Sequence, residues 1–213
     1  MAILTVKRYP HPALRKIAAP TTDFGPALKE AAASMLETLY KVQGWGLSAN
    51  QVGLDERLFV LDMALENVEP LCMVNPVIIE KANPVLSDED CLSFPGVHVT
   101  QERARDITVQ YQDLDGNQQT SKFEGLLACG IQHEIDLLNG VLIIDSLSKL
   151  KRDRLLKQYK KVLTSGHVHG PQCNHGHHHD HTHEHVHGPD CDHEHHEHVH
   201  GEHCQHEHEH EHS

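Results

Sequence analysis

The chain has 213 residues, a formal net charge of −13, 23 histidines and six cysteines. Residues 166–213 hold 20 of these histidines and ten acidic residues, but no Lys or Arg. The remaining 165 residues carry 21 acidic and 18 basic side chains and are about 45% apolar, as in ordinary globular domains. We therefore expect a folded domain over residues 1–165. A tail rich in His, Cys, Asp and Glu follows over residues 166–213, cannot bury a core and is expected to be disordered.

The composition also excludes several classes of protein. No apolar run approaches the 18 residues of a transmembrane helix, and residues 1–8 lack the layout of a secretory signal. The cysteines are therefore expected as free thiols in the cytoplasm rather than as a disulfide framework. The nearly balanced charge of residues 1–165 argues against DNA as a ligand, and no membrane partner is expected.

The first half of the chain predicts an arm, a helix and two strands. Prolines in residues 9–20 indicate an extended arm or a short helical turn. Apolar residues at steps of three and four predict a helix over residues 26–43. Strands are expected over residues 57–63 and 72–80, and Asn75-Pro76 places a bulge or a sheet edge in the second.

The second half predicts one more strand and two helices. Alternating apolar residues indicate a strand over residues 106–111, followed by a turn at Asp115-Gly116. Helices are expected over residues 123–138 and 147–163. Because strands and helices do not alternate regularly, the order of elements predicts an α+β domain.

The helix expected over residues 123–138 carries His133-Glu134-Ile135-Asp136-Leu137. In a helical His-Glu-x-x-His motif the two imidazoles face the same way and share a metal ion, while the glutamate acts on metal-bound water. Here Leu137 occupies the position of the second imidazole. On its own the pair is also consistent with a partly buried histidine beside a surface glutamate.

Two upstream segments accompany this motif: Gly44-Trp45-Gly46-Leu47-Ser48-Ala49-Asn50-Gln51 and Glu89-Asp90-Cys91-Leu92-Ser93. In this order the three segments resemble those of the peptide deformylase family, whose patterns are Gly-x-Gly-Leu-Ala-Ala-x-Gln, Glu-Gly-Cys-Leu-Ser and His-Glu-x-Asp-His. The resemblance covers nearly all of residues 1–165. It implies mixed or antiparallel sheets around a central motif helix. It also implies metal-dependent hydrolysis of the N-formyl group on the first methionine of nascent polypeptides.

The resemblance assigns roles to individual residues. Cys91 and His133 match two metal ligands, and the family's metal is typically Fe(II), replaceable by Ni(II) or Zn(II). Glu134 matches the general acid and base. The side-chain amide of Gln51 and the backbone N–H of Leu92 match the groups that stabilise the oxyanion. Gly46 matches the position where the backbone approaches the substrate closely.

The chain departs from the family pattern near the expected metal. An alkyl side chain at Leu137 cannot donate electrons, so two protein ligands remain. Cys129 lies one helical turn before His133 and offers an alternative donor, although a buried apolar cysteine is the favoured interpretation. Asp90 replaces a glycine, where backbone freedom is expected to matter. Ser48 and Asn50 are milder changes.

Two functional hypotheses follow. The first is a deformylase-like enzyme, impaired by the loss of one metal ligand. The second is a deformylase paralogue without catalysis that binds, stores or delivers Zn or Ni. Residues 147–163 contain seven Lys and Arg residues, which form either a solvated helix face or a contact with the ribosome.

The tail contains three similar nine-residue copies, at residues 167–175, 185–193 and 198–206. Each supplies three or four imidazoles and a thiol, which are donors for Zn(II), Ni(II) or Cu(II). An expression tag is the alternative, but tags are plain histidine runs without cysteine. The expected tail ligands are His167, His169, Cys173, His175, His185, His187, Cys191, His193, His198, His200, Cys204 and His206.

Overall fold

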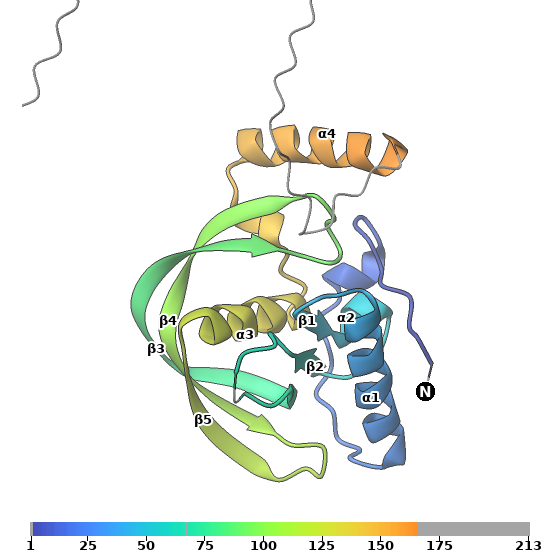
Figure 1. Ribbon diagram of the computed structural model, residues 1–213, viewed down its shortest axis with the longest axis vertical. Helices are drawn as coiled ribbons and strands as arrows, with labels where there is room; N and C mark the ends of the chain where they lie inside the picture. Colours follow the sequence, from blue (N-terminus) through green and yellow to red (C-terminus); the bar gives the residue numbers. More distant parts are fainter. Residues whose placement is uncertain (1, 67, 166–213) are drawn as a thin grey trace, which may run out of the picture. The chain divides into compact units, whose positions relative to one another are not determined.

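Five strands form an antiparallel sheet that curves around one helix, α3 (Gly125–Leu138) (Figure 1). The computed structural model describes residues 2–66 and 68–165. Each strand pairs with the next along the chain. The strands are β1 (Gly46–Ser48), β2 (Leu58–Leu61), β3 (Leu71–Asp90), β4 (His98–Gln112) and β5 (Gln118–Glu124). The predicted α+β class, with antiparallel strands around the motif helix, is confirmed.

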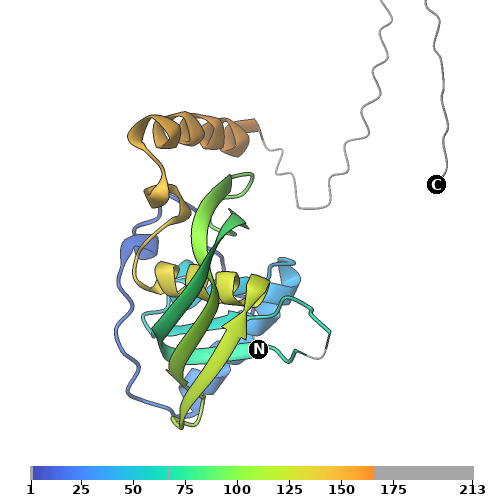
Figure 2. The same ribbon diagram turned by 90° about the vertical axis from the view of Figure 1, so that its left-hand side faces the viewer.

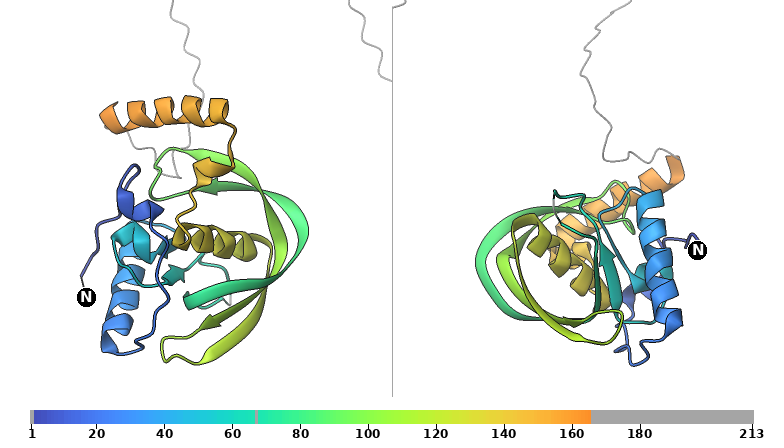
Figure 3. Two further views of the ribbon diagram at one scale, coloured as in Figure 1. Left: turned by 180° about the vertical axis from the view of Figure 1, so that it is seen from behind. Right: turned by 60° about the horizontal axis from the view of Figure 1, so that its bottom comes forward.

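Strands β3 and β4 form a long bent hairpin that wraps around α3 (Figure 3). Their register begins at Val74 and ends where Asp90 lies opposite His98. It shifts at Asn75-Pro76 and again before Glu80. The interruption predicted at Asn75-Pro76 is therefore a bulge, which bends the strand.

The sequence underestimates the length of this hairpin. It predicts strands over residues 72–80 and 106–111, whereas residues 81–90 and 98–105 continue the same two strands. The added part of β3 is mostly exposed. It therefore lacks the alternating apolar face from which a strand is predicted.

Helices α1 (Pro26–Lys41) and α4 (Lys149–Ser165) lie close to their predicted ranges. A 3-10 turn at Ile143–Ser146 precedes α4. Another 3-10 turn at Pro12–Arg15 lies within the predicted arm. The short helix α2 (Ala49–Val52) follows β1, and the sequence predicted neither β1 nor α2 because each is too short for a periodic pattern.

The predicted start of α3 is wrong by two residues. Phe123 and Glu124 complete strand β5, and the helix begins at Gly125, which has a φ of +60°. A left-handed residue lets the chain change direction between strand and helix. The apolar spacing around Phe123 cannot distinguish the end of a strand from the start of a helix.

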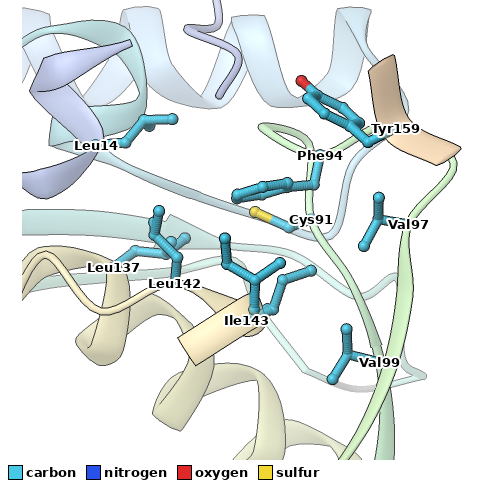
Figure 4. Packing of buried hydrophobic residues seen from close by; sticks show 10 residues of the cluster. Leu14, Cys91, Phe94, Val97, Val99, Leu137, Leu142, Ile143 and Tyr159 are labelled. Carbon is cyan, nitrogen blue, oxygen red and sulfur yellow. The ribbon is translucent and has the colours of Figure 1, made fainter. Parts of the chain in front are cut away.

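Helix α3 is the centre of the core because it is apolar on several sides. Figure 2 shows it in the hollow of the sheet. Its residues Ala128, Ile131 and Ile135 belong to one buried cluster with Phe59 of β2. Leu137 faces a second cluster, which contains Cys91, Phe94, Leu142 and Tyr159 (Figure 4). The motif helix is thereby held in a fixed position between the sheet and the segments around Cys91.

Three other observations bear on the expectations from the sequence. Cys72, Cys91 and Cys129 are free thiols, as predicted for them. In the part of the chain that the structure describes, no helix has both the length and the apolar character needed to cross a membrane. The predicted tail over residues 166–213 lies outside the described residues, so its boundary and its disorder remain predictions.

The two glycines that flank α3 give a matched pair of stability predictions. Both have positive φ, but a Cβ on Gly140 would lie 2.6 Å from the backbone oxygen of Arg15, whereas a Cβ on Gly125 would meet nothing within 4 Å. We expect Gly125→Ala to lower the free energy of unfolding by about 1 kcal/mol, from backbone strain alone. Gly140→Ala should lower it by about 3 kcal/mol, because a clash with backbone is added. Urea unfolding followed by circular dichroism measures both, and equal losses would contradict the assigned contact.

Candidate active site

The structure brings Cys91 and His133 together from two different elements. Cys91 begins the turn over residues 91–97, here called the Cys91 turn, directly after β3 ends at Asp90. His133 lies on α3, and its imidazole is hydrogen-bonded to the Cys91 thiol on one side. On the other side, Nδ1 of His133 lies 3.0 Å from Oε2 of Glu89. Contacts with Cys91 and with Glu89 therefore hold the ring in one orientation.

A buried ion-pair network orients His133. Arg103 of β4 donates from Nε to Glu89 Oε1 at 2.6 Å and from a terminal nitrogen to Glu89 Oε2 at 2.9 Å. Its other terminal nitrogen donates to Asp136 Oδ2 at 2.5 Å, and Gln101 also donates to Glu89. Such a bidentate pair has a defined geometry as well as charge. The network joins both strands of the hairpin to α3.

The network changes the pKa values of its members. Burial alone would raise the pKa of Glu89, but hydrogen bonds from Arg103 and His133 outweigh it and lower that pKa to about 2. Burial alone would lower the pKa of His133, whereas its hydrogen bonds to Cys91 and Glu89 raise it. The carboxylate of Glu89 is therefore ionised across the ordinary pH range and holds the imidazole in place.

Sequence reasoning did not assign roles to Glu89, Arg103, Gln101 or Asp136. Asp136 stands three residues after His133, and Glu89 stands two before Cys91, so each offered a weak positional signal. Arg103 gave no such signal, because its approach to Glu89 depends on the register of the long hairpin.

Glu134 lies on α3 with its carboxyl group directly against β1. A Cβ on Gly46 would lie 2.2 Å from Glu134 Oε1, so only glycine leaves room for this carboxyl group. Glu134 is 4% exposed, and its Oε2 has no hydrogen-bond partner among the described residues. The observed role of Gly46 is thus to make space for Glu134, while the predicted close approach to a substrate remains a prediction.

Burial raises the pKa of Glu134 to about 7, and the nearby charge of Glu89 adds to this effect while His133 opposes it. A carboxyl group that titrates near neutral pH can both accept and return a proton. The geometry therefore suits the general acid and base role predicted for Glu134.

The amide of Gln51 is aimed at the Cys91 turn. Its Oε1 accepts hydrogen bonds from the backbone N–H of Ser48 at 2.9 Å and from the Ser48 hydroxyl at 3.1 Å. Its Nε2 donates to Ser93 Oγ at 3.1 Å and lies 3.6 Å from Cys91 Sγ. Ser48, which departs from the family pattern, thus fixes which end of the amide faces Cys91.

Leu92 follows Cys91, and its side chain packs close to Gly44, where a Cβ would lie 2.8 Å from Leu92 Cδ1. In residues 2–66 and 68–165, the backbone N–H of Leu92 donates no backbone hydrogen bond. The Leu92 N–H therefore lies beside Cys91 without a backbone acceptor, whereas the Gln51 amide is engaged by Ser93 and faces Cys91. The oxyanion role assigned to both groups remains a prediction.

Leu137 occupies the position expected for the third metal ligand. It is 1% exposed and packs with Cys91, Phe94 and Leu142 (Figure 4). The side-chain amide of Asn50 donates to the backbone oxygen of Leu137, so α2 and α3 are in direct contact at this position. The leucine is an integral part of the core and not an exposed replacement.

The residues of this site do not fit a metal centre with three protein ligands. Cys91 and His133 supply sulfur and nitrogen donors that suit Fe, Ni or Zn, but Leu137 supplies none. Among the described residues, no group of three His, Cys, Asp or Glu side chains could hold a metal ion. Cys129 is buried on α3 and does not complete such a group.

The expectation that the backbone at position 90 needs the freedom of glycine is wrong. Asp90 ends strand β3, paired with His98, and does not have the positive φ that would require glycine. Its side chain is largely exposed and contacts the His98 imidazole. Its charge therefore points to solvent rather than into the site.

Comparison with known proteins decides the family. The family described as polypeptide deformylase matches residues 3–153 of this chain. The chain belongs to the polypeptide deformylase family. The peptide deformylase of Alkalilimnicola ehrlichii is 41% identical over 169 residues, which cover 79% of this chain and 95% of that protein. That of Endomicrobium trichonymphae is 42% identical and covers 78% and 99%.

Solved deformylase structures share the fold. A peptide deformylase from Legionella pneumophila has a TM-score of 0.71 at 38% identity, covering 76% of this chain and 98% of that one. A peptide deformylase from Synechococcus elongatus in complex with actinonin has a TM-score of 0.69 at 35% identity, covering 74% and 88%. The family is metal-dependent. The incomplete donor set of this deformylase-family chain is therefore a departure at the centre of the family's chemistry.

The raised pKa of Glu134 predicts a pH-dependent cost in stability. Because the pKa is about 7 in the folded chain against an ordinary 4.5, ionising Glu134 destabilises the fold by about 3 kcal/mol. Glu134→Gln stays neutral at every pH. The stability of wild type relative to this variant should be level below pH 4.5, decrease as the pH rises from 4.5 to about 7, and be level again above that.

Urea unfolding at several pH values between 5 and 8.5 measures this difference. Glu30→Gln, an exposed position on α1, is the matched control for replacing a carboxyl group by an amide. A constant difference between wild type and Glu134→Gln over this range would show that Glu134 is not buried as described.

Proposed function

We propose that this chain is a deformylase that removes the formyl group from the N-terminal methionine of nascent polypeptides, with activity impaired by Leu137. The convergence of Glu134, Gln51 and the Leu92 N–H on the Cys91–His133 pair carries this proposal. These groups come from three separate segments, and a chain without selection for the site has no reason to keep them together. The proposed place of action is the cytoplasm, at the ribosome.

The residues of the chain can each perform part of the hydrolysis. Glu134 can take a proton from the attacking water and return it to the amine as the formamide C–N bond breaks, which yields formate and a free N-terminus. Gln51 and Leu92 can donate hydrogen bonds to the negative oxygen that forms on the formyl carbon. Glu89 and Arg103 keep His133 from rotating.

Impairment follows from Leu137. Even changes in groups that only orient a metal ligand reduce metal affinity or activity by about 10–100-fold, so replacing a ligand itself should cost more. Asn50 and the apolar cluster hold Leu137 in place, so the backbone cannot readily bring another donor to this position. We accordingly expect the described domain to bind Fe(II), Zn(II) or Ni(II) weakly.

A second candidate function is metal binding by the tail, with Zn(II), Ni(II) or Cu(II) as ligand and storage or delivery as its purpose. The three Cys-containing copies over residues 167–206 support it. About four-fifths of this chain accounts for nearly the whole length of these relatives, which leaves about a fifth for a function of its own. Under this second function, the deformylase domain no longer catalyses hydrolysis. The exposed Lys and Arg residues of α4 remain the proposed ribosome contact in either case.

Restoring the missing ligand tests the first function. Leu137→His, in a chain ending at Ser165, should bind one equivalent of Fe(II), Ni(II) or Zn(II) and should release formate from a formyl-Met peptide at least about 100-fold faster than wild type. Metal analysis and a coupled formate assay under anaerobic conditions measure both. Adding Glu134→Ala should abolish the gain in turnover but not the bound metal. A wild-type chain as active as Leu137→His would contradict the impairment.

Deleting the tail tests the second function. Full-length protein should bind about one equivalent of Zn(II) per copy, hence several per chain. A chain ending at Ser165 should lose that binding. Equilibrium dialysis followed by elemental analysis gives the stoichiometry. If the value is the same with and without residues 166–213, the tail does not bind metal and the second function is wrong.

A further inference from the structure

Helix α4 reaches the active site through one buried side chain. Most of α4 is exposed, but Tyr159 is 3% exposed and belongs to the apolar cluster that contains Cys91 and Leu137 (Figure 4). Its ring centroid lies 5.6 Å from that of Phe94 and 6.3 Å from that of Tyr9. An otherwise charged helix thus inserts an aromatic ring into the cluster that surrounds the Cys91 turn.

The hydroxyl of Tyr159 ties two segments together. It donates to the backbone oxygen of Tyr9 at 3.0 Å and lies 3.4 Å from the backbone oxygen of Ser93. The backbone N–H of Tyr9 donates to the same Ser93 oxygen at 3.0 Å. The rings of Tyr9 and Phe94 stack with centroids 4.9 Å apart. Buried carbonyl groups need such donors, so the hydroxyl contributes directly to the position of Ser93.

The Cys91 turn, which Tyr159 contacts at Ser93, includes Cys91 and lies against Gln51. The backbone N–H of Phe94 donates to the backbone oxygen of Cys91 at 2.8 Å, which closes the Cys91 turn. The hydroxyl of Ser93 accepts from Gln51 Nε2, the amide group that also faces Cys91 Sγ. A continuous set of contacts therefore runs from Tyr159 through Ser93 to Gln51 and Cys91.

We propose that Tyr159 is a positioning residue that holds the Cys91 turn against Gln51. It acts through Ser93 and Phe94 and touches no reacting group. Its hydroxyl stands at the point where the N-terminal arm, the Cys91 turn and α4 meet. The role concerns the position of Cys91 and does not require turnover, so it can be tested separately from the proposed function.

The test compares full-length Tyr159→Phe with wild type after removal of metal by a chelator. This change keeps the ring and removes only the hydroxyl. Iodoacetamide labelling is followed by mass spectrometry of tryptic peptides, in which residues 82–103 carry Cys91 and residues 123–149 carry Cys129. Losing the hydroxyl should let the Cys91 turn open more often, and Cys91 should react about fivefold faster.

Cys129 is the internal control, because it is as buried as Cys91 but lies on α3. Its labelling rate should stay unchanged in Tyr159→Phe. Tyr111→Phe is the control variant, because it removes a hydroxyl that lies near Ser121 in the β4–β5 pair. It should leave the labelling of both cysteines unchanged. If Cys91 and Cys129 react faster together in Tyr159→Phe, the hydroxyl stabilises only the whole domain and the proposal is wrong. Unchanged rates at both cysteines would also overturn it.

Discussion

The ion pair between Glu89 and Arg103 is the contact on which the geometry of the site depends. It joins the end of β3 to β4, and through Asp136 and His133 it joins both strands to α3. Isolated buried charges are costly, so a carboxylate in this position requires such partners. Without Arg103, the carboxylate of Glu89 would be left with too few donors, and the imidazole of His133 would lose its fixed partner.

Two of the residues that depart from the family pattern, Ser48 and Leu137, are built into the site, whereas Asp90 faces solvent. Asn50 donates to the backbone oxygen of Leu137, and Ser48 orients Gln51 toward Cys91. Leu137 itself completes an apolar cluster that includes the Cys91 side chain. The site is therefore well packed around a position that offers no donor to a metal. This packing is why restoring a histidine there is an informative change: the supporting groups are already in place.

The sequence predicts the main parts of the fold and of the site for different reasons. Helices α1 and α4 follow from apolar spacing, and the three motifs indicate that Cys91, His133, Glu134 and Gln51 meet, as they do in the structure. The roles assigned to these residues remain predictions. The start of α3 and the conformation of Asp90 are wrong, because local spacing and family pattern do not report backbone angles.

Other contacts cannot be obtained from the sequence because they depend on tertiary structure. Arg103 meets Glu89 only when β3 and β4 pair in one register, and Tyr159 meets Ser93 only when α4 folds back over the Cys91 turn. Neither residue lies in a motif. The residues to which the motifs assign chemistry are thus easier to predict than those that position them, since the second group is defined by packing alone.

The long β3–β4 hairpin restricts how this gene can change in length. Successive side chains of a strand point to opposite faces, so inserting or deleting one residue between the bulge at Asn75 and the end of β3 would turn Glu89 away from Arg103. A change of one residue in this segment therefore breaks the Glu89–Arg103 pair unless a further bulge absorbs it. By contrast, the turn at Asp115-Gly116 joins β4 and β5 beyond the site, where a change of length leaves Glu89 facing Arg103.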